Sequence, residues 1–329
     1  MALTSRLLFL LISIISAAYL AYNSSIARSM ASQAAAKNLA YAGSKLNGTN
    51  PVAIFVGGTS GVGQGMAEAF NRHTKGNSHI VLVGRNRDAA EKIIENMKSV
   101  AGGSATGSYE FVQCDISLMS NVKKTAAEIV QKYPKINFLL IPAGVMGAAA
   151  TRTSEGLDKT AAVHYYGRWT FIHGLLPSLR AAKDAKEEAK VMPVYGPGES
   201  GGGADTMVTY NDLMCEEYGL RNPGIVFAHG APGAVRTGIL KASDSPILNA
   251  MHYILPLMRP FTVSQDECGE FLWKGLYNTT TTKGSGSIPG VYRIDSKGND
   301  LGMAKYFGSP EERKALWKHS CEVAGVNDP

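Results

Sequence analysis

The chain has 329 residues, of which 45% are hydrophobic and 18% are charged, and its formal net charge is +6. This composition is enough for one sizeable core and gives no sign of a long disordered segment. The basic residues are scattered without interleaved aromatics, and the four cysteines lie far apart without the spacing of a zinc site or a disulfide framework. We therefore expect one main domain with reduced thiols, no bound metal and no nucleic-acid partner.

The N-terminus carries an uncharged hydrophobic run, Leu7 to Tyr22, preceded by Arg6. Its length is just short of the roughly 20 residues that cross a bilayer comfortably. A cleavable signal peptide is the alternative, because Ser16 and Ala18 satisfy the small-residue rule for cleavage. We expect residues 1–29 to form a membrane anchor, in the endoplasmic reticulum, unless translation starts at Met30 and gives a cytoplasmic protein. Residues 30–50 form a lead-in without chemistry.

The stretch from Val52 to Phe70 predicts a strand, a tight turn and a helix. An apolar run, Val52 to Val56, enters a glycine-dense turn, after which apolar residues recur at the spacing of one helical face. Glycine allows positive φ angles and close approach of a ligand, and the helix directs its free N–H groups and positive dipole end at the turn. The turn therefore suits a phosphate, and a purely structural glycine turn is the alternative. Its candidate binding residues are Gly57, Thr59, Ser60, Gly61, Val62 and Gly63.

This turn resembles that of the short-chain dehydrogenase/reductase family, whose members carry glycines at this spacing after their first strand. The dinucleotide fingerprint G-x-G-x-x-G is not met, because Met66 occupies the position of its third glycine. The resemblance covers roughly residues 52–237. It implies a Rossmann fold over residues 51–329, with a substrate lid from about residue 238. Strands that alternate with helices along the chain also predict an α/β doubly wound parallel sheet.

The end of the second predicted strand, His79 to Val83, indicates which cofactor is bound. In a dinucleotide fold this position meets the adenosine ribose, where an acidic residue binds a free 2′-hydroxyl and an arginine accepts a 2′-phosphate. The strand is followed by Arg85 and Arg87, without Asp or Glu between them. NADP(H) is therefore favoured over NAD(H), with the alternative that both arginines only begin the next helix on its solvent side.

Three further strand ends complete the expected cofactor site. After the strand Tyr109 to Cys114, the resemblance implies that Asp115, beside Ile116, accepts a hydrogen bond from the adenine amino group. A cap for the following helix is the alternative role of Asp115. The resemblance also implies cofactor contacts after the strands Ile136 to Ile141 and Ile225 to His229, at Ala143, Gly144, Pro232, Gly233 and Thr237.

The family's catalytic residues, a serine after the fifth strand and a tyrosine one helical turn before a lysine, are not intact here. In the family the lysine lowers the pKa of the tyrosine, which exchanges a proton with the substrate oxygen that the serine holds. Met214 stands where a lysine should follow Tyr210, and Tyr195 lies near the expected serine, at the end of the strand Lys190 to Tyr195. Without an adjacent cation, we expect the phenol pKa to stay near 10.

Two more residues are candidates at this site. Ser200, in a glycine-rich loop, is close enough in sequence to supply the hydroxyl that holds the substrate oxygen. His164 occupies the place of a family asparagine that steadies the lysine through water, and a partly buried polar residue on a helix is the alternative. For Tyr210 the alternative is a packing residue inside its helix.

Several other elements follow from apolar periodicity. They are helices over Arg87–Met97, Asn121–Lys132 and Gly156–Ala182, apolar helical patches at Ile247–Met258 and Cys268–Leu276, and a late strand at Val291–Ile294.

The first functional hypothesis is an NADP(H)-dependent carbonyl reductase or secondary-alcohol dehydrogenase that acts on a small apolar molecule. The second is a catalytically silent NADP(H)-binding protein of the same fold. A remote third is a serine hydrolase, because residues 198–202 match G-x-S-x-G around Ser200. Its acid would be Asp244 or Asp266, and its base His319.

Overall fold

The computed structural model describes residues 25–145, 151–196, 206–238 and 262–327, which fold around one sheet. The strands are β1 (Val52–Val56), β2 (His79–Gly84), β3 (Ser108–Gln113), β4 (Phe138–Ile141), β5 (Lys190–Pro193), β6 (Val226–Gly230) and β7 (Val291–Ile294). They lie in the order β3-β2-β1-β4-β5-β6-β7, with all neighbours parallel. The strand order reverses between β1 and β4, and ligands of such sheets bind in the crevice beyond the carboxyl ends at that point.

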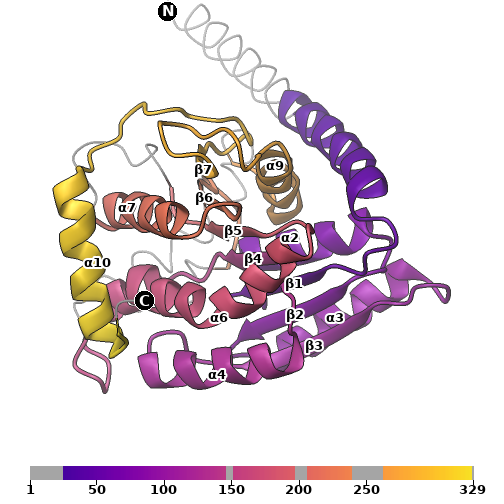
Figure 1. Ribbon diagram of the computed structural model, residues 1–329. Coiled ribbons are helices and arrows are strands. Elements are labelled where there is room, and N and C mark those ends of the chain that lie inside the picture. Colours follow the sequence, from indigo (N-terminus) through magenta and orange to yellow (C-terminus); the bar gives the residue numbers. More distant parts are fainter. Residues whose placement is uncertain (1–24, 146–150, 197–205, 239–261, 328–329) are drawn as a thin grey trace, which may run out of the picture.

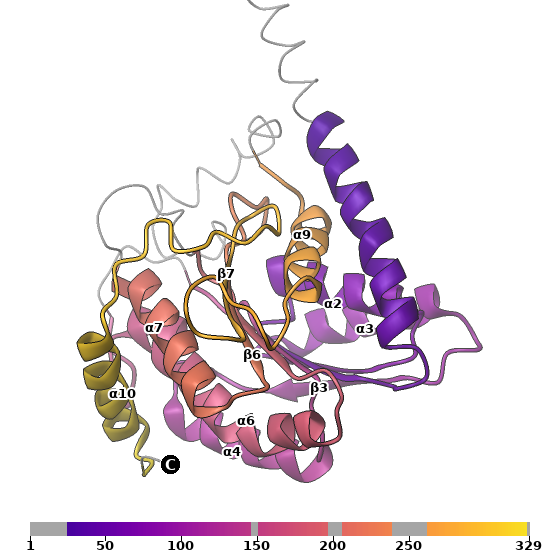
Figure 2. The ribbon, with the colours of Figure 1, turned by 45° about the horizontal axis from the view of Figure 1, so that its top comes forward.

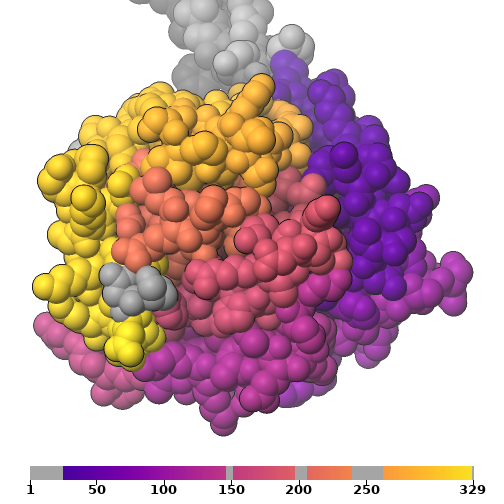
Figure 3. Space-filling view, in the orientation of Figure 1, coloured from indigo at the N-terminus to yellow at the C-terminus, as the bar shows by residue number. Residues whose placement is uncertain are grey.

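Helices cover both faces of the sheet (Figure 1). The named helices are α2 (Gly61–His73), α3 (Arg87–Ala101), α4 (Met119–Lys132), α5 (Lys159–Ala161), the π-helix η1 (Ala162–Tyr166), α6 (Gly167–Asp184), α7 (Thr206–Arg221), α9 (Gln265–Tyr277) and α10 (Pro310–Ala324). α2, α3 and α9 share a buried hydrophobic cluster with one face, whereas α4, α6, α7 and α10 share a second cluster with the other. Figure 3 shows α10, in yellow, along the left edge of the face that includes α7 and α6.

The strand sequences are apolar because both faces of the sheet are covered. Every residue of β1 is buried, and neighbours alternate between the two clusters, so that Ile54 packs under one layer and Phe55 under the other. Parallel strands of this kind are near-continuous hydrophobic runs. This burial explains why the sequence pattern located the strands so well.

α2 and α9 cross with their backbones in contact. A Cβ atom on Gly65 would lie 2.1 Å from the carbonyl oxygen of Gln265, and one on Gly269 would lie 2.6 Å from the carbonyl oxygen of Gly65. Trp273 Nε1 donates a hydrogen bond of 2.8 Å to the carbonyl oxygen of Met66, whose side chain is fully buried. Only glycine permits such an approach. Gly65 therefore allows α2 to pack closely against α9. It directly precedes Met66, which occupies the position of the fingerprint's third glycine.

Residues 25–45 form a helix that lies beside α9 (Figure 2), although the sequence suggested only a lead-in over residues 30–50. Asn38 Nδ2 donates to the backbone oxygen and to the carboxylate of Glu270, both at 2.9 Å. The Tyr41 ring stacks on Tyr277 with 4.2 Å between ring centroids. These contacts make the helix part of the core on that face.

The predicted doubly wound parallel sheet is confirmed, and β1 and β7 have the predicted bounds. The single helix predicted from Gly156 to Ala182 is instead made of α5, η1 and α6, because the turn at η1 widens to a π-helix. α10 was not among the elements predicted from the sequence. The helical patch predicted at Ile247–Met258 lies outside the described residues.

The prediction of a membrane-anchored protein of the endoplasmic reticulum is wrong. Among the residues that the structure describes, no helix has the length and apolarity needed to cross a bilayer. The hydrophobic run Leu7 to Tyr22, on which that prediction rested, lies outside the described residues.

Candidate active site

A cavity of about 400 Å³ opens at the carboxyl ends of β1, β2, β3 and β4. It lies at the point where the strand order reverses, as expected for a nucleotide site in such a sheet. Of the residues expected to bind a cofactor, those that line it are Gly57, Thr59, Ser60, Gly61, Val62, Arg85, Asp115, Ile116, Ala143, Gly144 and Thr237. Gly63, Arg87, Pro232 and Gly233 do not line it.

The glycine turn requires glycine at specific positions. Gly57 has a φ of +92°, and a Cβ there would lie 2.6 Å from the Cα of Ala143 at the end of β4. Gly61 has a φ of +57° and packs under Thr237, which returns from the loop after β6. A Cβ on Gly63 would lie 2.2 Å from the carbonyl oxygen of Gly57, so a side chain there would clash with the backbone of the turn. These residues keep the cavity floor free of side chains.

The first turn of α2 faces this floor without a side-chain cap. Ser60 is the N-cap residue in an extended conformation, and its side chain makes no capping hydrogen bond. No acidic residue lies in the first turn. The free N–H groups and the positive dipole end of α2 are therefore available to an anion.

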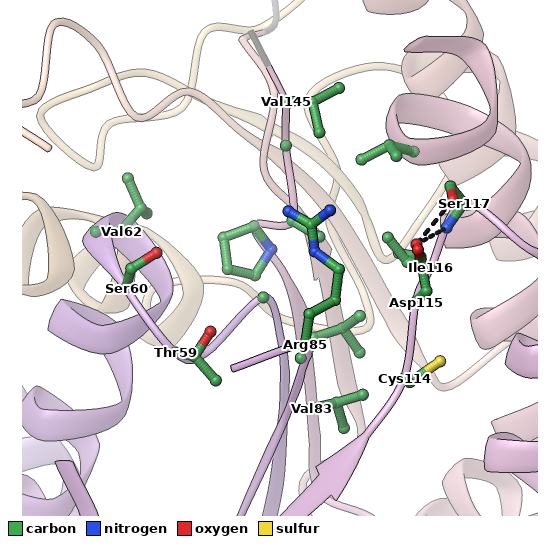
Figure 4. A pocket seen from close by; sticks show the side chains of 18 of the residues that line it. Thr59, Ser60, Val62, Val83, Arg85, Cys114, Asp115, Ile116, Ser117 and Val145 are labelled. Carbon is green, nitrogen blue, oxygen red and sulfur yellow. Dashed lines mark hydrogen bonds between the residues drawn. The ribbon is translucent and has the colours of Figure 1, made fainter. Parts of the chain in front are cut away.

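The two arginines after β2 have different environments. Arg85 extends into the cavity between the glycine turn and the segment Asp115 to Ser117 (Figure 4). Its guanidinium makes no hydrogen bond or ion pair with any described residue. Arg87 is 3.7 Å from Glu91 and lies over the Phe111 ring at 5.0 Å. Of the two arginines, Arg85 lines the cavity and Arg87 does not, so Arg85 is the one placed to meet a phosphate there.

Asp115 lines the cavity and does not cap α4. Its Oδ1 accepts hydrogen bonds from the backbone N–H and the hydroxyl of Ser117 at 2.9 and 2.7 Å (Figure 4). The first turn of α4 is capped instead by Glu155, which accepts from the backbone N–H groups of Met119 and Ser120. This cap comes from a distant loop, so the sequence pattern could not indicate it. It leaves Asp115 free of the capping role.

His164 lies in η1, just behind the cavity wall. Its Nε2 accepts a hydrogen bond of 3.0 Å from the backbone N–H of Val145, which lines the cavity. Burial, together with the charge of Arg168, lowers the pKa of His164 to about 3. The imidazole is therefore neutral at physiological pH, and its buried Nδ1 has no hydrogen-bond partner among the described residues. In this environment His164 fixes the loop after β4 through a direct hydrogen bond.

Tyr195 and Tyr210 lie in different places. Tyr195 follows β5 at its carboxyl end, with its ring centroid 4.9 Å from that of His164. Tyr210 lies in the second turn of α7 and packs edge-on against Tyr165 at 5.3 Å, next to the core and away from the cavity lining. Ser200 lies outside the described residues.

The structure brings a cation to Tyr195 that the sequence pattern did not indicate. Arg168, in α6, is 1% exposed, and its guanidinium carbon lies 5.5 Å from the centroid of the Tyr195 ring. The sequence did contain one indication of this cation, because His164 and Arg168 are one helical turn apart within an otherwise apolar segment. The expectation that no cation accompanies the candidate phenol is therefore wrong for Tyr195.

Of the residues proposed for a hydrolase, the two that the structure describes do not assemble. Asp266 is exposed in the first turn of α9, whereas His319 is on α10, on the opposite face of the sheet, with its Nε2 2.9 Å from the Tyr166 hydroxyl. Asp244 lies outside the described residues. Two groups on opposite faces of a sheet cannot serve one nucleophile.

Comparisons with known proteins agree with this geometry. The family model described as short chain dehydrogenase matches residues 51–190. An oxidoreductase of Emericella nidulans is 31% identical over 240 residues, which cover 67% of this chain and 70% of that protein. The chain belongs to the short-chain dehydrogenase/reductase family. As a member of it, this protein is an oxidoreductase of the short-chain type.

Solved structures of other proteins have the same fold. The 3-ketoacyl-(acyl-carrier-protein) reductase of Brucella melitensis, in complex with NADH, has a TM-score of 0.54 at 20% identity and covers 77% of this chain and 98% of that one. RhlG of Pseudomonas aeruginosa, in complex with NADP, has a TM-score of 0.56 at 19% identity and covers 77% of this chain and 97% of that one. The two structures contain different dinucleotides, so the shared fold by itself does not distinguish NAD(H) from NADP(H).

Proposed function

We propose that this protein is an NADP(H)-dependent oxidoreductase that interconverts a carbonyl group and a secondary alcohol on a small apolar molecule. The choice of NADP(H) is supported by one observation. The guanidinium of Arg85 lies in the cavity and has no hydrogen-bond or ion-pair partner among the described residues. No Asp or Glu lies between the end of β2 and the start of α3, where a carboxylate would bind a free ribose 2′-hydroxyl. A 2′-phosphate would give Arg85 a charge-assisted hydrogen bond.

The residues of the cavity fit the rest of such a dinucleotide. The uncapped first turn of α2 and the glycines with positive φ at positions 57 and 61 would hold the pyrophosphate. Asp115 would accept a hydrogen bond from the adenine amino group through Oδ2, since Oδ1 is occupied by Ser117. When bound, the nicotinamide would supply or accept the hydride.

Tyr195 is the favoured proton donor and acceptor of this chain. It stands at the carboxyl end of β5, next to the end of β4, where Ala143 to Val145 line the cavity. A phenol can pass a proton to a substrate oxygen as a carbonyl is reduced, and take one from an alcohol in the reverse direction. Tyr210 is less favoured, because its ring packs against Tyr165.

Titration with NADPH and NADH tests the cofactor assignment. Arg85→Gln should weaken NADPH binding by about 1.5–3 kcal/mol, the usual value of a hydrogen bond to a charged group, and should change NADH binding little. Arg87→Gln is the matched control, because Arg87 lies outside the cavity with Glu91 and Phe111. Equal losses for both cofactors in Arg85→Gln would show that the arginine does not meet a 2′-phosphate.

A catalytically silent NADP(H)-binding protein is the second candidate function. It is favoured by the replacement of the family lysine by Met214, which is buried in the core. A broad panel of ketones, aldehydes and secondary alcohols distinguishes the two. Tight NADPH binding without any hydride transfer across the panel would establish the silent protein.

A further inference from the structure

We propose that Arg168 replaces the missing lysine by placing a fixed buried cation beside Tyr195, which lowers the proton affinity of that phenol. This inference rests on the proposed function, because it supplies the proton chemistry of an oxidoreductase. Arg168 acts through Tyr195 and forms no bond to substrate, so it is a positioning residue. Met214, at the sequence position of the usual lysine, takes no part.

The position of Arg168 is fixed by contacts to two other elements. Its terminal nitrogens donate to the carbonyl oxygen of Ala143 at 2.7 Å and to Asn211 Oδ1 at 3.3 Å. Asn211 is itself held, because its Nδ2 donates to the carbonyl oxygens of His164 and Met207 at 2.9 and 2.8 Å. The guanidinium is thus tied to the loop after β4 and to α7, which leaves its charge over the Tyr195 ring.

The charge of Arg168 is not neutralised by the described part of the chain. No carboxylate there forms an ion pair with it, and its buried Nε has no hydrogen-bond partner. Burial lowers the pKa of Arg168 to about 10, which still leaves it charged at neutral pH. A buried unpaired charge is costly unless an anion forms beside it. The Tyr195 phenolate is such an anion, and it would form during the proton transfer itself.

The other titratable groups around Tyr195 do not supply this cation. Burial keeps His164 neutral on one side. On the other side, His229 accepts from the backbone N–H of Gly196 through Nε2 and lies 2.7 Å from Asp212 through Nδ1. Burial lowers the pKa of His229 although Asp212 opposes this, and burial raises the pKa of the Cys215 thiol, which lies on α7. Among these groups Arg168 alone is cationic at neutral pH with its charge directed at the ring.

The ionisation of Tyr195 can be followed directly by NMR of protein labelled with carbon-13 at the tyrosine Cζ. The resonance that is absent from Tyr195→Phe belongs to Tyr195. In the parent it should titrate about one to two pH units below the usual value of about 10, the effect of a unit charge at this separation in a medium of effective dielectric about 20. Arg168→Gln should move the titration up by the same amount, and Arg168→Lys should restore most of it.

Arg180→Gln is the matched control, because it makes the same change in the same helix. Arg180 is bound to Asn222, away from Tyr195, and its loss should leave the Tyr195 titration unchanged. If Arg168→Gln does not fold, the parent alone decides. A Tyr195 resonance that titrates at or above about 10 overturns the inference, as does an unshifted titration in a folded Arg168→Gln protein.

NADPH titration and the pH profile of alcohol oxidation separate this inference from the proposed function. Arg168→Gln should still bind NADPH, while the alkaline rise of kcat should move up by about one to two pH units. A parent protein that does not bind NADPH would refute the proposed function alone. A kcat profile that does not move in Arg168→Gln, with binding intact, would refute the role of Arg168.

Discussion

The imidazole of His164 shows how burial decides the behaviour of a single residue. A histidine usually titrates near 6.5 and responds to physiological pH. Here the side chain is 6% exposed, and its Nε2 is occupied by the N–H of Val145. Protonation would place a second positive charge next to Arg168 in a buried site. His164 is therefore better suited to holding the cavity wall than to exchanging protons.

This environment predicts a pH dependence of stability. The folded-state pKa of His164 is about 3 and the unfolded value is about 6.5, so between these values the unfolded chain binds the extra proton. The free energy of unfolding should fall as pH drops below about 6.5, by about 1.4 kcal/mol per pH unit from this residue. His164→Asn, which removes the titratable imidazole, should remove that part of the slope in urea unfolding.

His319→Asn on the exposed side of α10 is the matched control for His164→Asn, and it should keep the slope of the parent. If the slope between about pH 6.5 and 4 is the same in His164→Asn as in the parent, the neutral buried histidine is not the origin of the acid sensitivity.

At the level of elements, the backbone contact between α2 and α9 is the tightest constraint on the helical layer beside the glycine turn. The carbonyl of Gln265 occupies the space that any side chain at Gly65 would need. Neither group can move independently, because α9 is fixed by its own capping box of Ser264 and Glu267 and by the hydrogen bond from Trp273. The position of α2, and with it the uncapped first turn that faces the cavity, depends on this crossing.

Gly65→Ala should therefore destabilise the protein by about 1–3 kcal/mol, the usual cost of overpacking, although alanine favours a helix more than glycine. The matched control is Gly43→Ala in the helix at residues 25–45, where a Cβ would meet no atom within 4 Å. That change should stabilise the protein by up to about 1 kcal/mol. Urea unfolding of the two variants should give effects of opposite sign, and a stabilising effect of Gly65→Ala would contradict the crossing geometry.

For the whole molecule, the helix at residues 25–45 completes the core on the α9 side. Asn38 reaches Glu270, which also contacts His73 and Arg72. Burial opposes ionisation of Glu270, but these hydrogen bonds hold its pKa at about 2, so it is a carboxylate at neutral pH. Tyr41 adds a hydrogen bond to Glu188 at 2.6 Å. Without the helix, a charged group would lose a partner and apolar surface would be exposed.

Two truncations test this role. Deletion of residues 1–29 keeps Asn38, Tyr41 and Leu46 and should leave stability close to that of the parent. Deletion of residues 1–48 removes them and should cost about 3 kcal/mol or more, from one hydrogen bond to a charged group and one buried leucine. Both proteins should bind NADPH equally well, because the cavity lies at the strand ends. Equal thermal stability of the two truncations would show that the helix only rests on the surface.

The sequence by itself determined the features that depend on near neighbours in the chain. The strand, turn and helix around Gly57 were predictable because glycine spacing and apolar periodicity are local properties. The different environments of Arg85 and Arg87 were not predictable from the sequence, because the partners of Arg87 include Phe111 on another strand. The cap that Glu155 places on α4 and the partners of the helix at residues 25–45 likewise come from distant segments.

The tertiary structure alone decided the charge beside Tyr195. Arg168 and Tyr195 are far apart in the chain, and they meet because β4 and β5 are neighbours in the sheet while α6 packs across their face. A motif of fixed spacing cannot describe such a pair, since the cation comes from a different helix than the one that carries the family lysine. Sequence reasoning found the lysine missing, and folding brought another cation to the carboxyl end of β5.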